Sequence, residues 1–433
     1  MNLLVIGSGG REHALAWAAA RSPLAPRVFA MPGNPGIGRI GTLVPGNPDD
    51  PQAVLAAVRE QAIDLVLIGP EKPLVAGLAD ALLAAGVRVF GPRAAAARIE
   101  GSKIFAKELM RRAGVPTADF HIAEDSQTGF ALAAALPLPL VVKADGLAAG
   151  KGALIVRDRE EARSAVEALM VERRFGAAGA RVLFEEFLEG EELSIFAIAA
   201  GEQYRLLPPA QDYKRALEGD RGPNTGGMGS YAPVVGWDAR LEQRVRAGVI
   251  EPTLSAMARA GCPYTGLLYC GLMISRGEPQ VIEFNCRFGD PETQAVVPLL
   301  GGGLLEGLWA AADPQAEKLG IPPVAWQGGT AICVVMASAG YPGPVAGGVL
   351  IEGIPAAEEV PGAIVFQAGT RMDGGRLATA GGRVLNVVGV GRDLGEARER
   401  AYAAVEAVHF PGGFFRRDIA WRGMETLRQR CGG

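Results

Sequence analysis

The first 91 residues alternate short apolar runs with helical patterns, and this alternation strongly limits the folds open to the chain. Each apolar run has the length and composition of a buried strand. The expected elements are strands at 2–6, 27–31, 63–69 and 87–90 and helices at 11–21 and 75–85. Such an order predicts a doubly wound parallel sheet with a ligand crevice at the carboxyl ends of its strands. We therefore expect an α/β domain over residues 1–100.

The first strand leads into its helix through a glycine turn, Gly7-Ser8-Gly9-Gly10, a geometry suited to holding a phosphate at the helix N-terminus. Arg11 opposes the helix dipole there, which indicates that it serves an anion. The turn lacks the full G-x-G-x-x-G spacing and no acidic residue ends the next strand, which argues against a dinucleotide. The alternative is a purely structural turn. The residues expected in this crevice are Gly9, Gly10, Arg11, Asn34 and Glu71.

A second glycine-rich stretch, Leu138 to Gly152, follows another apolar strand pattern. Glycine allows backbone N–H groups to approach an anion closely, and lysine adds a movable point charge. The stretch is not a Walker loop, because Gly152 stands where that motif needs a hydroxyl. The alternative is a hairpin turn with solvated lysines. The candidate anion-binding residues are Lys143, Gly146, Gly150, Lys151 and Gly152.

Lysine is scarce in this chain. Only seven of the 43 basic residues are lysine, and the rest are arginine. Lysine is expected to persist where a guanidinium cannot replace it. Four lysines stand beside glycine-rich or acidic motifs: Lys103, Lys143, Lys151 and Lys214. Their placement favours a phosphate role over the hairpin alternative.

Two further strands end in polar residues. The strand at 181–187 ends in Glu185, Glu186, Phe187 and Leu188, with Glu192 nearby. Such an end can accept hydrogen bonds from an adenine amino group and a ribose hydroxyl, or it can be a solvated edge.

The strand at 279–285 places Glu283 and Asn285 on one face, with Arg287 two positions further. Hard oxygen donors at this spacing are a partial shell for Mg²⁺, which takes water and phosphate oxygens for the rest.

Between these strands, residues 211–231 form a polar, glycine-rich stretch that we expect to be a long functional loop. The other expected elements are helices at 103–113, 158–171 and 238–260, strands at 153–157 and 264–275, and a last domain with strands at 330–336, 349–352, 363–367 and 383–390 and a helix at 394–408. The expected divisions are 1–100, a central domain of 101–116 and 191–325, an inserted lid of 117–190, and 326–433.

Composition excludes several classes of function. A net charge of −4 gives no reason to expect nucleic-acid or membrane-surface binding. Five cysteines without C-x-x-C spacing and three scattered histidines argue against zinc and favour reduced thiols. No basic leader or apolar run of spanning length is present, so we expect a cytoplasmic protein.

Eight segments, taken together, closely resemble the phosphoribosylamine–glycine ligase family of the ATP-grasp superfamily. They are GSGGREHALAW, GPEKPLVAGLAD, GSKIFAKELM, VVKADGLAAGKG, FEEFLEGEELS, GPNTGGMGSY, YTGLLYCGLM and VIEFNCRFGDPETQ. The resemblance runs in order from about residue 2 to residue 422, and FNCRFGDPET and NTGGMG are its most specific parts. It implies a ligase that uses ATP to join glycine to 5-phosphoribosylamine through glycyl phosphate, giving glycinamide ribonucleotide in purine synthesis.

The resemblance also implies roles for individual residues. Lys103 and Lys143 resemble the phosphate-binding lysines and Gly146 to Gly152 the mobile flap. Glu185 to Leu188 resembles the adenine hinge and Glu192 the ribose carboxylate. Glu283 and Asn285 match the ligands of Mg²⁺ or Mn²⁺. The residues matching the region of glycine and the acyl phosphate are Asn224, Thr225, Gly226, Gly227, Met228, Gly229, Arg287 and Asp290, and Asp212 and Lys214 are also expected to bind substrate. The expected catalytic residues are Arg287, Asp290 and Lys143.

One departure from the wider superfamily concerns the metal. Many relatives place a first acidic ligand about a dozen residues before the second, where this chain reads Tyr269-Cys270-Gly271-Leu272-Met273. The metal site is therefore expected to use more water and phosphate oxygens. We expect only small-molecule partners and a monomer or weak dimer. The alternatives are a nicotinamide oxidoreductase, a nucleotide-binding regulator without catalysis, and a superfamily ligase for another acid and amine.

Overall fold

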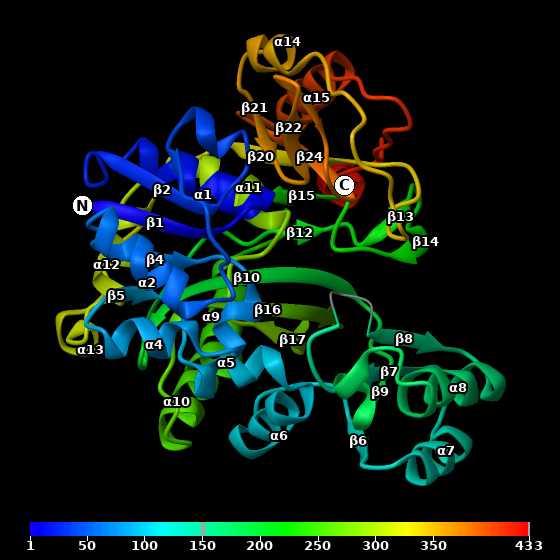
Figure 1. Cartoon of the computed structure of the whole chain (residues 1–433). Helices are drawn as coiled ribbons and strands as arrows, with labels where there is room; N and C mark the ends of the chain where they lie inside the picture. The colour runs from blue at the N-terminus through cyan, green and yellow to red at the C-terminus, as the bar shows by residue number, and fades with distance from the viewer. Residues whose placement is uncertain (149–151, 432–433) are drawn as a thin grey trace.

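The computed structural model describes residues 1–148 and 152–431 and shows a mixed α/β fold, as expected (Figure 1). The N-terminal sheet has the order β3-β2-β1-β4-β5, and all its pairs are parallel. Its strands are β1 (Asn2–Gly7), β2 (Arg27–Pro32), β3 (Thr42–Leu43), β4 (Leu65–Ile68) and β5 (Arg88–Phe90). The doubly wound sheet expected from the alternating pattern is therefore confirmed.

The helices of this part are α1 (Gly10–Ala20), α2 (Pro51–Glu60), α3 (Glu71–Val75), α4 (Leu78–Ala84) and α5 (Ala94–Gly101). The expectation of one helix over 75–85 was wrong. Gly77 adopts a left-handed conformation with φ of +90° and separates α3 from α4. Glu71 is thereby the first residue of its own short helix, at the carboxyl end of β4.

Helix α6 (Lys103–Ala113) leads into a separate four-stranded antiparallel sheet, the lid sheet, of order β6-β9-β7-β8. Its strands are β6 (Phe120–Ala123), β7 (Leu140–Ala144), β8 (Ala153–Val156) and β9 (Val182–Glu186), and helices α7 (Ser126–Ala135) and α8 (Arg159–Val166) accompany them. This unit has its own apolar core. β7 and β8 are hairpin partners, so the hairpin considered as the alternative for residues 138–152 is present.

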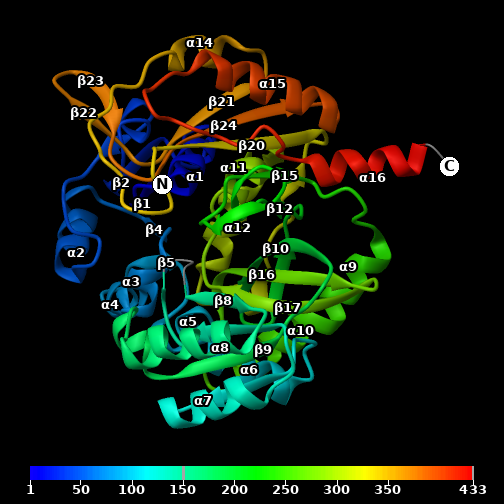
Figure 2. The same cartoon turned by 90° about the vertical axis from the view of Figure 1, so that its right-hand side faces the viewer.

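The central sheet is antiparallel, of order β11-β10-β16-β17, with strands β10 (Glu191–Ala200), β11 (Gln203–Leu206), β16 (Thr265–Ser275) and β17 (Glu278–Asn285). It lies between the lid sheet and the C-terminal sheet in both views (Figure 2). The other elements here are α9 (Ala239–Val245), α10 (Glu251–Arg259), α11 (Glu292–Val296), α12 (Leu304–Ala311), α13 (Ala316–Leu319), β18 (Leu300–Gly302) and β19 (Ala325–Trp326).

The C-terminal sheet has the order β12-β15-β20-β24-β21, with β20 (Thr330–Ala337), β21 (Ala363–Gln367) and β24 (Arg383–Gly391). The hairpin β22 (Thr370–Asp373) and β23 (Arg376–Thr379) and helices α14 (Ile354–Glu359), α15 (Leu394–Ala407) and α16 (Trp421–Cys431) complete this part. The expected strand at 349–352 is absent from the described chain and is replaced by isolated bridges at Leu350 and Glu352.

Residues 211–231 also differ from expectation. This stretch contains β12 (Gln211–Asp212), β13 (Arg215–Leu217), β14 (Arg221–Asn224) and the start of β15 (Gly229–Ala232). β12 and β15 join the C-terminal sheet because β15 pairs with β20. The expected boundaries assigned this stretch to the central domain, but its strands β12 and β15 extend the sheet of the C-terminal domain. The domain boundaries themselves stay a prediction.

Two large apolar clusters join the N-terminal sheet to the central sheet, and one of them also includes C-terminal residues. Within the described residues, we find no helix with the length and apolarity needed to cross a membrane.

Candidate active site

A cavity of about 690 Å³ brings together most of the residues singled out by the sequence. Its walls come from helices α1, α3 and α5 of the N-terminal part, from α6, and from the lid, central and C-terminal sheets. The predicted residues that line it are Arg11, Glu71, Lys103, Lys143, Gly146, Gly152, Glu185, Glu186, Phe187, Leu188, Glu192, Asp212, Lys214, Asn224, Thr225, Gly226, Glu283, Asn285, Arg287 and Asp290.

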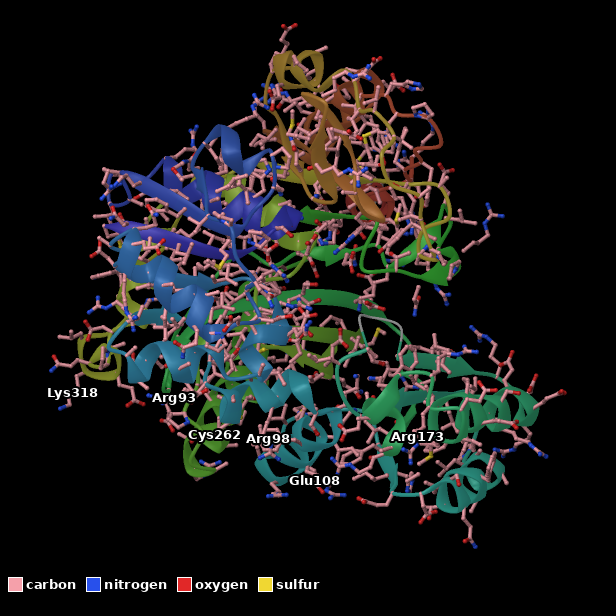
Figure 3. The ribbon with its side chains drawn as sticks, viewed as in Figure 1. Arg93, Arg98, Glu108, Arg173, Cys262 and Lys318 are labelled. Carbon is pink, nitrogen blue, oxygen red and sulfur yellow. The ribbon has the colours of Figure 1, made fainter. Side chains whose placement is uncertain are left out.

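The lysines follow this cavity closely. Six of the seven lysines lie in the described chain, and four of these line the cavity: Lys103, Lys107, Lys143 and Lys214. Lys72 pairs with Asp49 at the surface, and Lys318 stands at the outer end of α13 (Figure 3). Three of the four lysines that the scarcity argument singled out, Lys103, Lys143 and Lys214, therefore line this cavity, whereas Lys107 was not singled out.

Several predicted residues do not line the cavity. Gly150 and Lys151 lie outside the described residues. Met228 and Gly229 are buried in the fold, and Gly227 packs against Pro291. Asn34 donates to Ser8 O and Gln367 O, each at 2.8 Å, so its amide nitrogen ties the N-terminal sheet to β21. A ribose or phosphate role for this group stays a prediction.

The glycine turn after β1 already holds an anionic group of the protein itself. Gly9 donates its N–H to Glu12 Oε2 at 2.6 Å, and Arg11 Nε pairs with Glu12 Oε1 at 2.6 Å. Gly10 is covered by Asn386 and Gln294, where a side chain would clash. The turn therefore offers less free N–H than the sequence suggested. Arg11 keeps its place in the cavity wall, with its NH1 donating to Phe288 O at 3.0 Å.

Lys143, at the end of β7, is held by two contacts from different sheets. Its Nζ lies 2.9 Å from Glu185 Oε1 on β9 and donates to Ile282 O at 3.3 Å on β17. The Ile282 carbonyl is available for this contact because the register of the β16–β17 pair shifts at this point and leaves Ile282 unpaired. Such β-bulges are common near functional sites. Lys103, at the start of α6, donates to Gly146 O at 2.8 Å. Both predicted phosphate lysines thus face the same space.

Glu185 is the centre of a buried ion triad that the sequence did not indicate. Its second oxygen lies 2.9 Å from Lys107 Nζ, so one carboxylate is shared by two ammonium groups. Burial lowers the pKa of Lys107 to about 8, because its effect outweighs that of the nearby Glu185 carboxylate, which raises the pKa. The Glu185 side chain is therefore paired with lysines. In the rest of the predicted hinge, Glu186 is exposed and Phe187 and Leu188 are half-buried. The usable sequence signal was the i, i+4 spacing of Lys103 and Lys107 on one helix.

The predicted metal face is formed at the end of β17. Burial raises the pKa of the Glu283 carboxyl, but the surrounding cations, led by Lys214 and Lys143, more than offset this and lower it. The Asn285 amide nitrogen can face Glu100 Oε1 at 3.0 Å, which leaves its oxygen unused. Gly271 stands opposite Glu283 on β16, within the stretch Tyr269 to Met273, which contains no acidic residue.

This donor set fits Mg²⁺ in a limited way. An ionised carboxylate and an amide oxygen line one cavity, and hard divalent cations take such ligands together with phosphate oxygens. Within residues 1–148 and 152–431, no group of three or more His, Cys, Asp or Glu is placed to hold a metal. The protein alone is therefore a partial shell.

Arg287 lies between two carboxylates. Its Nε is 3.3 Å from Glu71 Oε2 and its NH2 is 3.1 Å from Glu100 Oε1. Glu100 also accepts from the Cys286 N–H at 2.7 Å. Glu100 was missed because nothing near it in sequence marks it. Arg287 is thus fixed at the junction of the N-terminal and central parts, facing the cavity.

Another acidic pair is formed by Asp212, at the end of β12, and Glu292, at the start of α11. Asp212 is buried, and its Oδ1 has no hydrogen-bond partner in the described structure. Burial and then the nearby Glu292 raise the Asp212 pKa well above its ordinary value. Glu292, also missed from sequence, accepts from Tyr269 OH at 3.0 Å and Ser194 Oγ at 3.1 Å. A buried carboxylate with a free oxygen is suited to a cationic ligand group.

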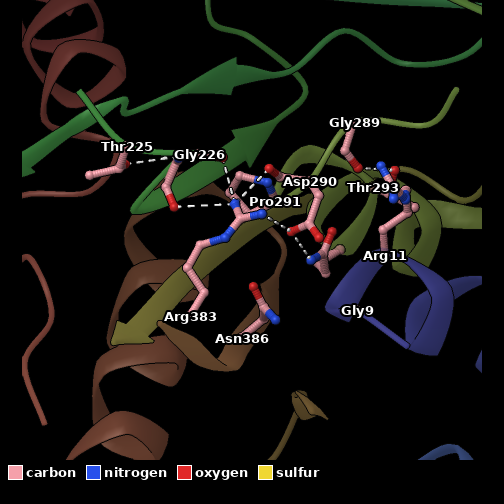
Figure 4. A network of polar contacts seen from close by, with 12 residues as sticks. Gly9, Arg11, Thr225, Gly226, Gly289, Asp290, Pro291, Thr293, Arg383 and Asn386 are labelled. Carbon is pink, nitrogen blue, oxygen red and sulfur yellow. Dashed lines mark hydrogen bonds and ion pairs between the residues drawn. The ribbon is translucent and has the colours of Figure 1, made fainter. Parts of the chain in front are cut away.

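The last missed residue comes from the C-terminal sheet. Arg383 reaches from β24 to the Gly226 carbonyl and to Asp290 (Figure 4). Burial raises the Asp290 pKa, but Arg383 and Arg11 more than offset this and lower it. Asp290 is therefore an ionised group at a point where three parts of the chain meet.

Family comparisons agree with this geometry. Models of phosphoribosylglycinamide synthetase match the chain as an N domain at 1–100, an ATP-grasp domain at 101–293 and a C domain at 331–422. A phosphoribosylamine–glycine ligase of Mesorhizobium japonicum is 48% identical over 428 residues, covering 99% of this chain and all of that protein. The trifunctional purine biosynthetic protein adenosine-3 of Gallus gallus is 44% identical over 99% of this chain, which matches 43% of that protein.

The solved structures that resemble this chain include a phosphoribosylamine–glycine ligase from Thermotoga maritima. It is 37% identical, covers 97% of this chain and 100% of its own, and superposes with a TM-score of 0.85. Together with the family models, these similarities confirm the resemblance carried by the motifs. The chain belongs to the phosphoribosylamine–glycine ligase family of the ATP-grasp superfamily.

Proposed function

We propose that the cavity is the active site in which ATP, glycine and 5-phosphoribosylamine give glycinamide ribonucleotide, ADP and phosphate. The observation that carries this proposal is the continuity of the cavity. It extends from Lys143 and the Glu186–Leu188 segment, past Glu283 and Arg287, to Arg11 and Glu71. A nucleotide, a small acid and a phosphorylated amine can therefore meet without leaving one enclosure. This reaction is a step of purine synthesis in the family.

The ATP end is assigned to the lid side. Glu186 to Leu188 would hold the adenine, and Glu192, which pairs with Lys214 at 2.8 Å, would meet the ribose. Lys103 and Lys143 would contact the phosphates, which requires Lys143 to share or leave Glu185. Glu283 and Asn285 would hold Mg²⁺ or Mn²⁺, which supplies neutralising charge to the phosphate oxygens when bound.

The acid and amine are assigned to the other half. Asp212, with its free oxygen beside Glu292, would accept the glycine ammonium, while Arg287 would face the glycine carboxylate. A carboxylate oxygen then attacks the γ-phosphorus and ADP departs, leaving glycyl phosphate. The amine of phosphoribosylamine attacks the acyl carbon, and phosphate leaves. Such chemistry needs positioning and compensation of spreading charge, which the lysines and Arg287 provide.

The cysteines indicate the cellular setting. The described cysteines Cys262, Cys270, Cys286 and Cys333 are free and buried, which suits a reducing compartment. We therefore propose a cytoplasmic enzyme, monomeric or weakly dimeric, with small molecules as its only partners.

ADP release tests the function. Wild-type enzyme should release ADP at its full rate only when both glycine and phosphoribosylamine are present. Lys143→Ala should lower that rate by orders of magnitude, because a phosphate lysine contributes several kcal/mol to the developing charge. Lys318→Ala, far from the cavity, is the control. ADP release that ignores glycine, or near-native turnover in Lys143→Ala, would contradict the proposal.

A further inference from the structure

The C-terminal sheet contributes one cation to the cavity wall. Arg383 begins β24, and its NH1 donates to Gly226 O at 2.5 Å, to Asp290 O at 2.7 Å and to Gly227 O at 3.4 Å. Its NH2 lies 3.5 Å from Asp290 Oδ1. One guanidinium therefore joins two segments that are more than sixty residues apart in the sequence.

The same sheet region holds Gly226 from its other side. The Gly226 N–H donates to Tyr341 OH at 3.0 Å, so both polar groups of this residue are bound by C-terminal side chains. A Cβ at Gly226 would lie 3.1 Å from Arg383 Cζ. A side chain there would press against the guanidinium, which explains why glycine allows this close approach.

Further contacts continue toward the nucleotide end. Gly227 donates its N–H to Thr225 Oγ1 at 3.0 Å, and Thr225 donates its N–H and hydroxyl to Lys214 O at 2.7 and 2.9 Å. Lys214 then pairs with Glu192 at 2.8 Å. The segment Asn224 to Gly227 is thus held at one end by the C-terminal sheet and at the other by the central sheet.

We propose that Arg383 is the positioning residue through which the C-terminal sheet sets the geometry of the glycine half of the site. This inference rests on the proposed function, since it takes Asp290 and the Asn224–Gly227 segment to surround glycine and its acyl phosphate. Three carbonyl oxygens and a carboxylate converge on one point, and without a cation they repel one another. Arg383 cancels that repulsion with a single planar group. Tyr341 supports it by fixing the Gly226 peptide plane.

The test compares substrate constants in four variants. In Arg383→Met we expect the KM for glycine to rise about ten-fold or more, because small displacements of positioning groups are costly. The KM for ATP should stay within about two-fold, since the lysines and the hinge are untouched. Arg383→Lys has one bond less reach and should fall between. Arg371→Met, which removes an exposed pair with Asp373 on the same C-terminal part, is the matched control.

Tyr341→Phe removes only the acceptor of the Gly226 N–H and keeps the ring, so it covers the case in which Arg383→Met does not fold. It should raise the KM for glycine several-fold at unchanged KM for ATP. Equal rises for ATP and glycine, or an unchanged glycine constant in Tyr341→Phe, would overturn the inference. Glycine-dependent ADP release by the wild type separates the two proposals. If the wild type releases ADP without any dependence on glycine, the proposed function itself is wrong. If its ADP release depends on glycine but the KM for glycine is unchanged in the variants, only the role of Arg383 is wrong.

Discussion

At the scale of single residues, the site is dominated by cations whose positions are set by carboxylates. Arg11 is held by Glu12, Lys143 by Glu185 and Arg287 by Glu71 and Glu100. Such pairing orients each cation and leaves part of it facing the cavity. An anion bound to such a cation would gain a charge-assisted contact without ordering a free side chain, which lowers the entropic cost of binding.

Arg11 provides the residue-scale prediction. We expect Arg11→Met to raise the KM for phosphoribosylamine about ten-fold or more and to leave ATP binding close to normal. The reason is that Gly9 already donates to Glu12, so Arg11 is the main donor left for a phosphate at this end. A charge-assisted contact contributes about 1.5–3 kcal/mol. Separate binding measurements for each substrate check this, with exposed Arg21→Met at the end of α1 as the control. If ATP weakens equally, the phosphate of phosphoribosylamine does not bind here.

At the scale of elements, a buried triad of side chains links the lid sheet to α6. Lys107 comes from α6, Glu185 from β9 and Lys143 from β7, and Lys107 also donates to Thr117 Oγ1 at 2.7 Å. Thr117 in turn donates to Val281 O on β17 at 2.6 Å. The phosphate lysine is therefore balanced against a second lysine on a different element. How firmly Glu185 holds Lys143 depends on the charge of Lys107.

Lys107 gives a prediction about pH. Burial and the positive charge of Lys143 lower its pKa, whereas Glu185 and Asp119 raise it, and the resulting value is about 8. Above pH 8 the amine is neutral, so Glu185 draws Lys143 more strongly and ATP binding should weaken. In wild-type enzyme, the KM for ATP should rise as pH passes from 7 to 9. Lys107→Arg stays charged and should show no rise near pH 8, whereas Lys107→Met should have a high KM throughout. Lys318→Met should follow the wild type; a Lys107→Arg profile equal to wild type would refute this role.

The same elements show what could be predicted from the sequence. β1, β7 and β17 are largely apolar runs next to glycine or polar residues. Their site residues Arg11, Lys143 and Glu283 were predictable because each lies near the carboxyl end of such a run. β12 and β15 were not predictable, since strands of two to four residues in a polar stretch have no periodicity of their own. They form because β20 supplies a partner.

The unpredicted site residues share a different cause. Lys107, Glu100, Glu292 and Arg383 act through contacts with residues far away in the chain. The sequence around such a residue does not show which distant residues it contacts, whereas a glycine turn or a strand end can be recognised from neighbouring residues. Motifs thus predicted many of the groups that line the cavity, and the structure was needed for the groups that hold them in place.

At the scale of the whole molecule, the site depends on how the N-terminal and C-terminal parts are joined. Asn34 bonds to Gln367 O, and the Gln367 N–H donates to His13 Nδ1 at 2.8 Å. The His13 ring also packs edge-on against Phe366 at 5.4 Å. Since Arg11 lies two residues before His13 on α1, this junction fixes the Arg11 end of the cavity relative to Arg383. Loss of the junction should therefore affect stability and the site together.

His13 makes this junction sensitive to acid. Burial lowers the pKa of His13 from its ordinary value of 6.5 to about 4. As the pH falls below 6.5, the unfolded chain therefore binds a proton at His13 that the folded chain does not, and the folded state loses stability. The resulting loss is complete near pH 4 and amounts to about 3 kcal/mol, of which about 2 kcal/mol is expected by pH 5. His13→Asn places an oxygen where Nδ1 stands and cannot titrate, so its stability should fall about 2 kcal/mol less between pH 7.5 and 5. Urea unfolding at both pH values measures this difference, with exposed His409→Asn as the control. Equal losses in His13→Asn and the wild type would show that the junction does not carry the acid sensitivity.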